Sequence, residues 1–244
     1  MTSNSINSHV KKILLVLSLL IVSVSPSIAG LLETGFEATY DVLYNEFYLG
    51  TAVRTLEPQG NQRWIYHSHT SPKGIASAFV SDIIDETSAI RKYNNRFQPT
   101  QYDYRQHGGK KDKVFQLKFD WESKQLSNTY TKKTYPLSAD THDLLSFQIQ
   151  LMQDMQAGKT SISYIIADKK RVDSYSLKLT ETEDVETPMK TFSAVKLVSN
   201  KIRDKMQFII WCAPELGYLP IKVMKIDDDG DESVLILGSL KLTP

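Results

Sequence analysis

The sequence predicts a mainly β fold: a large curved antiparallel sheet, or an incomplete barrel, that encloses one longer α-helix and carries a short helical flap. Apolar and polar residues alternate with a period of two along many short segments, which is typical of strands buried on one face. Turn-forming residues recur between these segments, which favours neighbouring antiparallel strands. Two segments break the alternation, and these predict the helix and the flap.

The first strand is predicted where every second residue from Phe36 to Tyr44 is apolar or aromatic. Gly50 interrupts the next alternating segment, so we expect a β-bulge or a close backbone approach there. Pro58-Gln59-Gly60-Asn61 then predicts a turn. The further strands are expected at 47–57, 62–70, 83–93, 100–106, 113–121, 126–134, 161–167, 175–182, 191–199, 206–213, 221–227 and 233–241.

Residues 140–157 predict the longer helix. Asp140 or Thr141 can cap its start, and Gly158 ends it. Apolar side chains cover more than half of the helix circumference, so we expect the helix to lie deep against the concave side of the sheet. Gln148 falls within this apolar arc and therefore needs a buried hydrogen-bond partner or a water.

The segment 71–81 is the second break in the alternation. Pro72 and Gly74 open it, and Ile75 and Phe79 then follow at helical spacing. A short helix or flap between two strands is expected here. Neither repeats nor linker-like composition divides the chain, so one domain is expected.

Residues 1–29 have the layout of a cleaved secretory signal peptide. Basic residues precede an apolar run at 13–24, and small residues lead to Ala29, after which we expect cleavage. The run is shorter than the roughly 20 residues that a membrane-spanning helix needs. We therefore expect a periplasmic protein whose mature part, 30–244, is a single exported β-rich domain without a transmembrane span.

Composition excludes several classes of function. The formal net charge is +1, and no concentrated basic face is apparent, so no nucleic-acid partner is expected. Cys212 is the only cysteine, which excludes an intramolecular disulfide, and its place in an alternating segment indicates a small buried hydrophobe. No Gly-rich phosphate loop follows a strand, and no cofactor is expected.

Two patterns raise the question of a metal site. His67 and His69 share one face of a predicted strand, where two imidazoles can bind zinc or copper. Because no third ligand is identifiable, ordinary strand histidines are the favoured interpretation. The acidic run at 227–232 fails the helix–loop–helix calcium pattern, since the positions that require acids hold Lys225 and Ile236.

Local nucleophile motifs are missing from the sequence, which makes an enzyme the less favoured reading. The absence is not decisive, because catalytic residues can assemble from distant parts of a chain, and no catalytic residue is assigned. The chain has 12 Tyr, 9 Phe and 3 Trp, which suit either a large β core or the wall of a lipid or glycan cavity.

Several short motifs, in their order and spacing, resemble one protein family over nearly the whole predicted mature chain. They are Tyr40-Asp41-Val42 with Gly50, Phe97-Gln98-Pro99, Asp143-Leu144-Leu145-Ser146, Trp211-Cys212-Ala213-Pro214 and Tyr218-Leu219-Pro220-Ile221-Lys222-Val223. Together they resemble the exported bacterial proteins of domain-of-unknown-function family 3108. The resemblance implies an envelope or periplasmic protein of mostly antiparallel β structure, and it supplies no activity, so no catalytic residue is carried over.

The leading hypothesis is a non-catalytic binding or carrier-like protein for an apolar or lipid-linked envelope ligand, such as a lipid or a lipid-linked glycan. Such a site needs no catalytic motif, and each buried methylene of an acyl chain gains about 0.8 kcal/mol. The candidate ligand-contacting residues are Leu151 and Met155 on the helix, Trp211 on a strand, and Ile75 and Phe79 on the flap acting as a lid.

Two alternatives remain open at this point. One is a structural or assembly factor of the envelope that holds a protein partner through a sheet edge or an aromatic patch. The other is a hydrolase of envelope polymers that acts through the face of His67 and His69.

Overall fold

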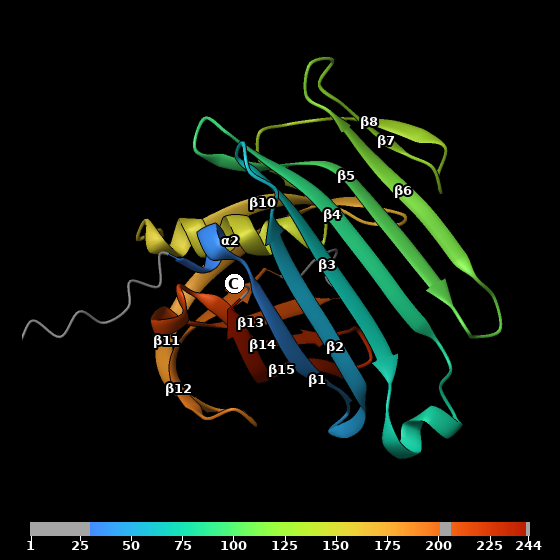
Figure 1. Ribbon diagram of the computed structural model, residues 1–244, viewed down its shortest axis with the longest axis vertical. Coiled ribbons are helices and arrows are strands. Elements are labelled where there is room, and N and C mark those ends of the chain that lie inside the picture. The colour runs from blue at the N-terminus through green and yellow to red at the C-terminus, as the bar shows by residue number, and fades with distance from the viewer. Residues whose placement is uncertain (1–29, 201–205, 243–244) are drawn as a thin grey trace, which may run out of the picture.

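The computed structural model describes residues 30–200 and 206–242, and the signal peptide expected at 1–29 lies outside them. The described part is mainly β, and its fifteen strands form one large open sheet (Figure 1). The strands are β1 (Phe36–Tyr44), β2 (Phe47–Pro58), β3 (Arg63–Pro72), β4 (Ile83–Tyr93), β5 (Arg96–His107), β6 (Lys113–Asp120), β7 (Gln125–Asn128), β8 (Lys133–Pro136), β9 (Thr141–His142), β10 (Ser161–Ala167), β11 (Val172–Glu186), β12 (Thr191–Ser199), β13 (Gln207–Ala213), β14 (Leu219–Ile226) and β15 (Glu232–Leu242).

The sheet consists of two runs of sequential strands that meet where β1 pairs with β15. Its edges are β8 and β9, which follow each other in the chain. All neighbouring strands are antiparallel except β9 and β10, where Thr141 lies opposite Ile165 in a parallel pair. The expectation of a purely antiparallel sheet is therefore wrong at this one short edge. A side chain links the two ends of the open sheet: Asn128 Nδ2 on β7 donates to the main-chain oxygens of Asp168 and Lys169, which follow β10, at 3.1 and 3.2 Å.

The observed strands follow the expected ones closely, with one clear exception. The single strand expected at 126–134 is two short strands, β7 and β8, around a turn. Asn128 explains the break, because its Oδ1 accepts hydrogen bonds from the backbone N–H groups of Tyr130 and Thr131 at 2.9 and 3.1 Å. Asn side chains commonly stabilise turns in this way.

Gly50 lies at a close approach of two backbones, as predicted. A Cβ at this position would be 2.1 Å from the main-chain oxygen of Ser71 on β3. The pairing of β1 with β2 also shifts register between Val42 and Leu43, directly beside Gly50. Both expected features, the bulge and the close approach, are therefore present at this glycine.

The longer helix, α2 (Ser146–Gln156), is shorter than the predicted helix at 140–157. Its start is shifted because β9 occupies Thr141 and His142, and Asp140 forms an ion pair with Arg96. Asp143 Oδ1 accepts from the backbone N–H groups of Leu145 and Ser146, both at 2.8 Å. Asp143 thus satisfies the first N–H groups of the helix, the role expected of Asp140 or Thr141.

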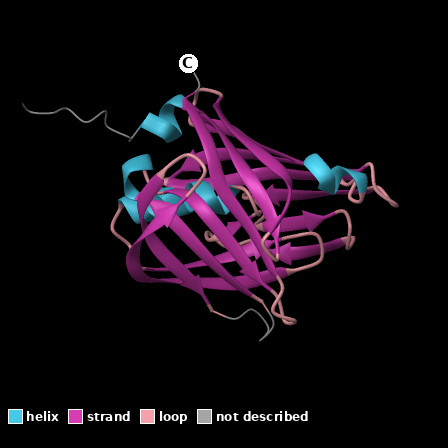
Figure 2. Cartoon of the chain, turned by 90° about the horizontal axis from the view of Figure 1, so that it is seen from below, coloured by secondary structure: helices cyan, strands magenta, loops and turns pink. Residues whose placement is uncertain are grey.

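The helix α2 contacts β5, β10 and β14, which belong to different parts of the sheet (Figures 1 and 2). Ile149 and Met152 pack into the larger hydrophobic cluster, whereas Leu151 and Met155 pack into a second cluster together with strands β10 to β13. Three shorter helical segments complete the described elements: α1 (Leu31–Thr34), η2 (Gly74–Ala78) and η3 (Pro214–Leu216). The short helical segment expected between β3 and β4 is η2.

Several turns gather at one end of the sheet, here called the η2 end. Tyr44 pairs with both Phe47 and Ser233, so the β1–β2 and β14–β15 turns lie there. Gly50 near the start of β2 pairs with Pro72 at the end of β3, so η2, which follows β3, lies at the same end. The β5–β6 turn lies there too, because Ile83 at the start of β4 pairs with His107 at the end of β5. Figure 1 shows these turns on the lower and right-hand side of the molecule.

Candidate binding cavity

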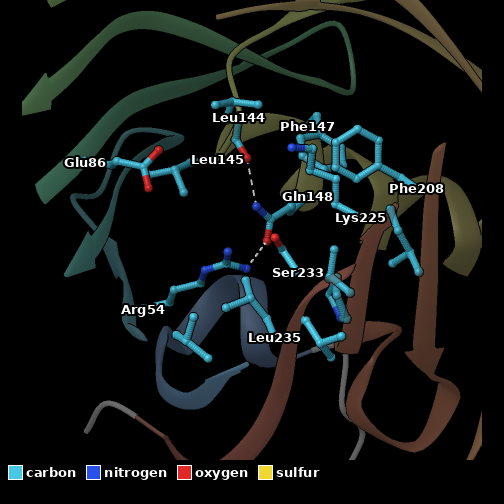
Figure 3. Close-up of a pocket in the computed structure, with 15 residues that line it drawn as sticks. Arg54, Glu86, Leu144, Leu145, Phe147, Gln148, Phe208, Lys225, Ser233 and Leu235 are labelled. Carbon is cyan, nitrogen blue, oxygen red and sulfur yellow. Dashed lines mark hydrogen bonds between the residues drawn. The ribbon is translucent and has the colours of Figure 1, made fainter. Parts of the chain in front are cut away.

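A cavity of about 250 Å³ lies between the start of α2 and strands from both halves of the sheet (Figure 3). Its walls come from β1, β2 and β4 on one side and from β13, β14 and β15 on the other. The lining residues are Val42, Arg54, Glu86, Leu144, Leu145, Phe147, Gln148, Phe208, Ile210, Pro220, Val223, Lys225, Ser233, Val234 and Leu235. Most of these side chains are apolar, which suits a ligand that water rejects.

A second, smaller void of about 50 Å³ adjoins the first. It shares Leu144, Phe147, Phe208 and Ile210 with the larger cavity, so these four side chains stand between the two spaces. The remaining walls of the smaller void are Tyr164, Ile166, Tyr175 and Leu177. The two voids therefore form one mostly apolar region beside the start of α2.

The polar end of the larger cavity is organised by Arg54. Its Nη1 donates to Gln148 Oε1 at 2.6 Å (Figure 3). Its guanidinium carbon lies 5.1 Å from the ring centroid of Tyr40. Gln148 Nε2 in turn donates to the main-chain oxygen of Leu144 at 2.8 Å. The predicted need of Gln148 for a buried partner is confirmed, and Arg54 is that partner. Among the residues that the structure describes, the buried Arg54 Nε finds no partner.

Two acidic side chains lie near this polar end. Burial raises the pKa of Glu86, although a hydrogen bond from the Tyr102 hydroxyl and the charge of Arg54 act in the opposite direction. Burial also raises the pKa of Asp143, which accepts from the Ser88 hydroxyl at 2.7 Å. The cavity wall therefore presents a guanidinium next to a carboxyl group that is harder to ionise than usual.

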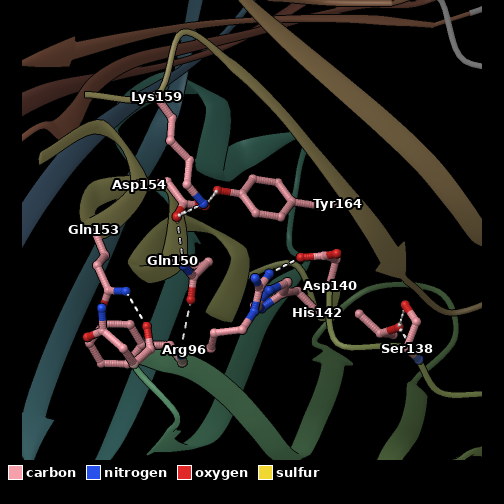
Figure 4. A network of polar contacts seen from close by, with 12 residues as sticks. Arg96, Ser138, Asp140, His142, Gln150, Gln153, Asp154, Lys159 and Tyr164 are labelled. Carbon is pink, nitrogen blue, oxygen red and sulfur yellow. Dashed lines mark hydrogen bonds and ion pairs between the residues drawn. The ribbon is translucent and has the colours of Figure 1, made fainter. Parts of the chain in front are cut away.

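The opposite side of α2 is held by a separate polar network (Figure 4). Asp154 accepts from Gln150 Nε2, Lys159 Nζ and the Tyr164 hydroxyl at 3.0, 2.7 and 2.8 Å. His142 lies close by, and burial, reinforced by the charge of Arg96, lowers its pKa to about 3. This network anchors the helix and leaves its first turn facing the cavity.

The flap residues Ile75 and Phe79 do not line either void. Both side chains are 85% exposed and lie on or beside η2. Their predicted role as ligand-facing lid residues stays a prediction, and in this structure they project away from the protein interior.

The other candidate residues are buried but lie outside the cavity lining. Leu151 and Met155 pack in the second hydrophobic cluster with Cys212, which points inward as predicted. Trp211 donates its Nε1–H to the Glu183 carboxylate. None of these three candidates is among the lining residues of the two voids.

Sequence reasoning missed Arg54 and Glu86, yet Arg54 left a trace in the sequence. It continues the inward-facing alternation of Ala52 and Leu56, both buried. A charged residue at an inward position of an apolar alternation indicates a buried polar site, because it requires partners.

His67 and His69 project from the face of β3 opposite to the buried Tyr66 and Ser68. The Nδ1 atoms of His67 and His69 lie 2.9 Å from Thr87 Oγ1 and 2.7 Å from Asp85 Oδ1. The second oxygen of the same aspartate lies 3.1 Å from Nε2 of His107 on β5. The carboxylate therefore bridges two imidazoles on the exposed face, and the metal role of the histidines stays a prediction.

The acidic run forms the turn between β14 and β15. Asp227, Asp228 and Asp229 each bring one carboxylate oxygen within 4.8 Å of the others. Strands flank this turn, so it is not part of a helix–loop–helix calcium site.

These features define a mainly β, barrel-like protein with an apolar cavity and one polar end. The chain belongs to the family described as Protein of unknown function (DUF3108), whose model matches residues 39–236. The resemblance of the short motifs to this family is therefore confirmed. None of the curated proteins matches the chain in sequence.

Solved structures support the fold. The chain is similar to the crystal structure of a beta-barrel-like protein of domain of unknown function DUF1849 from Brucella abortus, with a TM-score of 0.56 and 12% sequence identity over 86% of this chain and 98% of that chain. A "putative lipoprotein" from Parabacteroides distasonis is 13% identical over 86% of this chain and 96% of that chain, at a TM-score of 0.35. The first likeness concerns the fold alone, and the second is too distant to carry an argument.

Within residues 30–200 and 206–242, no helix combines the length and apolar character that crossing a bilayer requires.

Proposed function

We propose that this protein is a non-catalytic binding or carrier-like protein of the bacterial envelope, with an apolar or lipid-linked ligand. In this proposal residues 1–29 direct export, 30–244 act as a single periplasmic domain, and the curved sheet and α2 together surround the apolar part of the ligand. The observation that carries the proposal is the cavity of about 250 Å³ with mostly apolar walls. An apolar cavity of about 150 Å³ already binds benzene, so this space suits one acyl chain or ring.

The energetics favour a ligand with both an apolar and a polar part. Burying about eight methylenes gains about 6 kcal/mol, while association costs at least about 4 kcal/mol. The remainder is small, so a polar contact is needed for useful affinity. Arg54 can supply it, because a hydrogen bond to a charged group contributes about 1.5–3 kcal/mol.

The two alternative functions receive less support. Strand addition by a protein partner would use a sheet edge, and the edge strand β8 carries Lys133 and Pro136, which oppose such pairing. A hydrolase that uses His67 and His69 would have to act on the exposed face of β3. This face is opposite to the one that carries the buried Tyr66 and Ser68.

Native mass spectrometry of the protein purified from its own envelope fraction tests the proposal. We expect a co-purified ligand with an apolar chain, and we expect Val223→Phe to lose it because the larger ring fills the cavity. Met224→Phe is the matched control, since Met224 is the next residue of β14 and does not line the cavity. Ligand-free wild-type protein that also fails to bind added fatty acids would refute the proposal.

A further inference from the structure

The segment between β3 and β4 exposes two large apolar side chains. Ile75 and Phe79 are each 85% exposed, which places them among the most exposed large apolar residues in the described part of the chain. Ile75 lies within the short helix η2 and Phe79 directly follows it, and Gly74 opens this helix with a positive φ of 58°. Single exposed apolar side chains are common on protein surfaces, so these two become informative through the charge that lies beside them.

Lysines of the β5–β6 turn lie beside Phe79. The β5–β6 turn packs against the segment, because a Cβ at Gly109 would lie 2.1 Å from Asp82 Oδ1. Phe79 and Val80 share a shallow surface hollow with Lys110, Lys111 and Lys113 of this turn. We call residues 73–82 and 108–113 the η2 tip; the tip contains Lys73, Lys110, Lys111 and Lys113 against Asp82 and Asp112, so its net charge is positive.

The cavity reaches the same end of the molecule. Lys225 and Ser233 line it, and they lie next to the β14–β15 turn at the η2 end. Phe47, the first residue of β2 after the neighbouring β1–β2 turn, is 74% exposed. The acidic residues of the β14–β15 turn lie beyond β1 and β2, so the basic and acidic sides of this end are separated.

We propose that the η2 tip is a membrane-docking surface for an anionic bilayer. Ile75 and Phe79 enter the boundary between headgroups and acyl chains, and the lysines of the β5–β6 turn contact the anionic headgroups. Apolar side chains flanked by lysines bind membranes through these two contributions together. Docking would bring the end of the cavity that holds Lys225 to the bilayer surface.

A bilayer fits this tip better than a folded partner does. The two apolar side chains protrude singly from a short helix, whereas protein interfaces have an extended apolar centre with a polar rim. The net positive charge of the η2 tip, four lysines against two aspartates, matches a surface of uniform negative charge. The inference goes beyond the proposed function, because docking requires no occupied cavity.

Vesicle flotation of the purified protein tests the proposal. Mass spectrometry first defines the N-terminus of the purified chain. We expect the wild type to float with vesicles of phosphatidylcholine and phosphatidylglycerol, and more weakly with phosphatidylcholine alone. Ile75→Ser/Phe79→Ser should abolish flotation with both. Lys110→Gln/Lys111→Gln should weaken binding to the anionic vesicles about 25-fold, since each lysine contributes about fivefold in affinity.

Two further variants complete the test. Tyr93→Ser/Met189→Ser removes exposed apolar side chains from the turns at the opposite end of the sheet and should float like the wild type. Val223→Phe should also float normally, which separates docking from ligand binding. The proposal is overturned if the wild type binds no vesicle, if Ile75→Ser/Phe79→Ser floats unchanged, or if this variant instead loses self-association or a protein partner in sedimentation experiments.

Discussion

Arg54 Nη1 lies 2.6 Å from Gln148 Oε1 and connects β2 to the first turn of α2. This bond joins the sheet to the helix at the wall of the cavity, and the Gln148 side chain continues it to the main-chain oxygen of Leu144. The polar end of the cavity and the position of the helix therefore depend on the same contact.

Arg54→Met should destabilise the protein by about 1–3 kcal/mol. The substitution keeps an apolar stem but leaves the buried Gln148 Oε1 without its donor, and an unsatisfied buried group costs about this much. Arg54→Met/Gln148→Leu should cost less than the sum of the two single variants, because both partners are then removed. Urea unfolding measures all three, and strictly additive losses would mean that the bond contributes nothing.

Leu151→Ala should destabilise the protein by about 2–5 kcal/mol, the usual cost at a packed core site. Leu151 is fully buried in the second hydrophobic cluster and does not line the cavity. Val223→Ala is the comparison, since one side of Val223 already faces empty space and fewer contacts are lost. A loss for Leu151→Ala as small as that for Val223→Ala, measured by denaturant unfolding, would show that Leu151 also borders a void.

The stability of the fold should fall as the pH is lowered through the range that His142 controls. Its pKa is about 3 in the folded protein against an ordinary value of 6.5, mainly because of burial. Between these values the unfolded chain binds a proton that the folded chain does not, so acid favours unfolding by up to about 1.4 kcal/mol per pH unit. Above pH 6.5, the ordinary pKa of His142, this side chain no longer makes the free energy of unfolding depend on pH.

The matched measurement compares the wild type with His142→Gln by urea unfolding at several pH values. Carboxyl groups with shifted pKa values, such as Glu86 and Asp143, affect both proteins in the same direction. The difference in slope between the two proteins therefore isolates His142. Parallel curves would indicate that this side chain is protonated in the folded state.

Asp85 should lose its lowered pKa when both of its imidazole partners are removed. Partial burial raises the pKa of Asp85, but hydrogen bonds from His69 and His107 outweigh it and hold the pKa below its ordinary value. In His69→Gln/His107→Gln, carbon NMR of the Asp85 carboxyl group should show a higher pKa. His67→Gln is the control, because His67 contacts Thr87 instead.

Cys212 should resist thiol reagents in the folded protein. Its side chain is buried, and burial raises the pKa of the thiol well above its ordinary value. The reactive thiolate is therefore scarce even at mildly alkaline pH. Labelling with a maleimide, followed by mass spectrometry, should be slow in buffer and complete in denaturant; rapid native labelling would contradict the burial of this residue.

Local sequence patterns were sufficient to predict the positions of most strands, because the alternation of side chains and the turn residues act over only a few positions. They failed at Asn128, where one side chain accepts two backbone hydrogen bonds and ends a strand that the alternation would continue. They also misplaced the helix start, because Thr141 and His142 pair with β10, and sequence spacing does not report such a contact.

The cavity, like the sheet, was predicted from the sequence only in part. Gln148 was recognised as a buried polar residue because helical periodicity places it on the apolar arc. Arg54 and Glu86 were not recognised as its neighbours, since they come from β2 and β4 and approach α2 only when the sheet curves. Leu151 and Met155 share the same helix, yet they face packed side chains, because the direction of each helix face is set by what lies around it.

The sequence by itself determined the family, the predominance of strands, the inward face of most of them and the glycine that permits a close backbone approach. These properties follow from the period of side-chain direction and from backbone sterics, which act between near neighbours. Only the tertiary structure decided that β1 pairs with β15, that Arg54 reaches Gln148, and that the apolar flap projects outward beside lysines. These contacts join residues far apart in the chain, and the whole fold positions them.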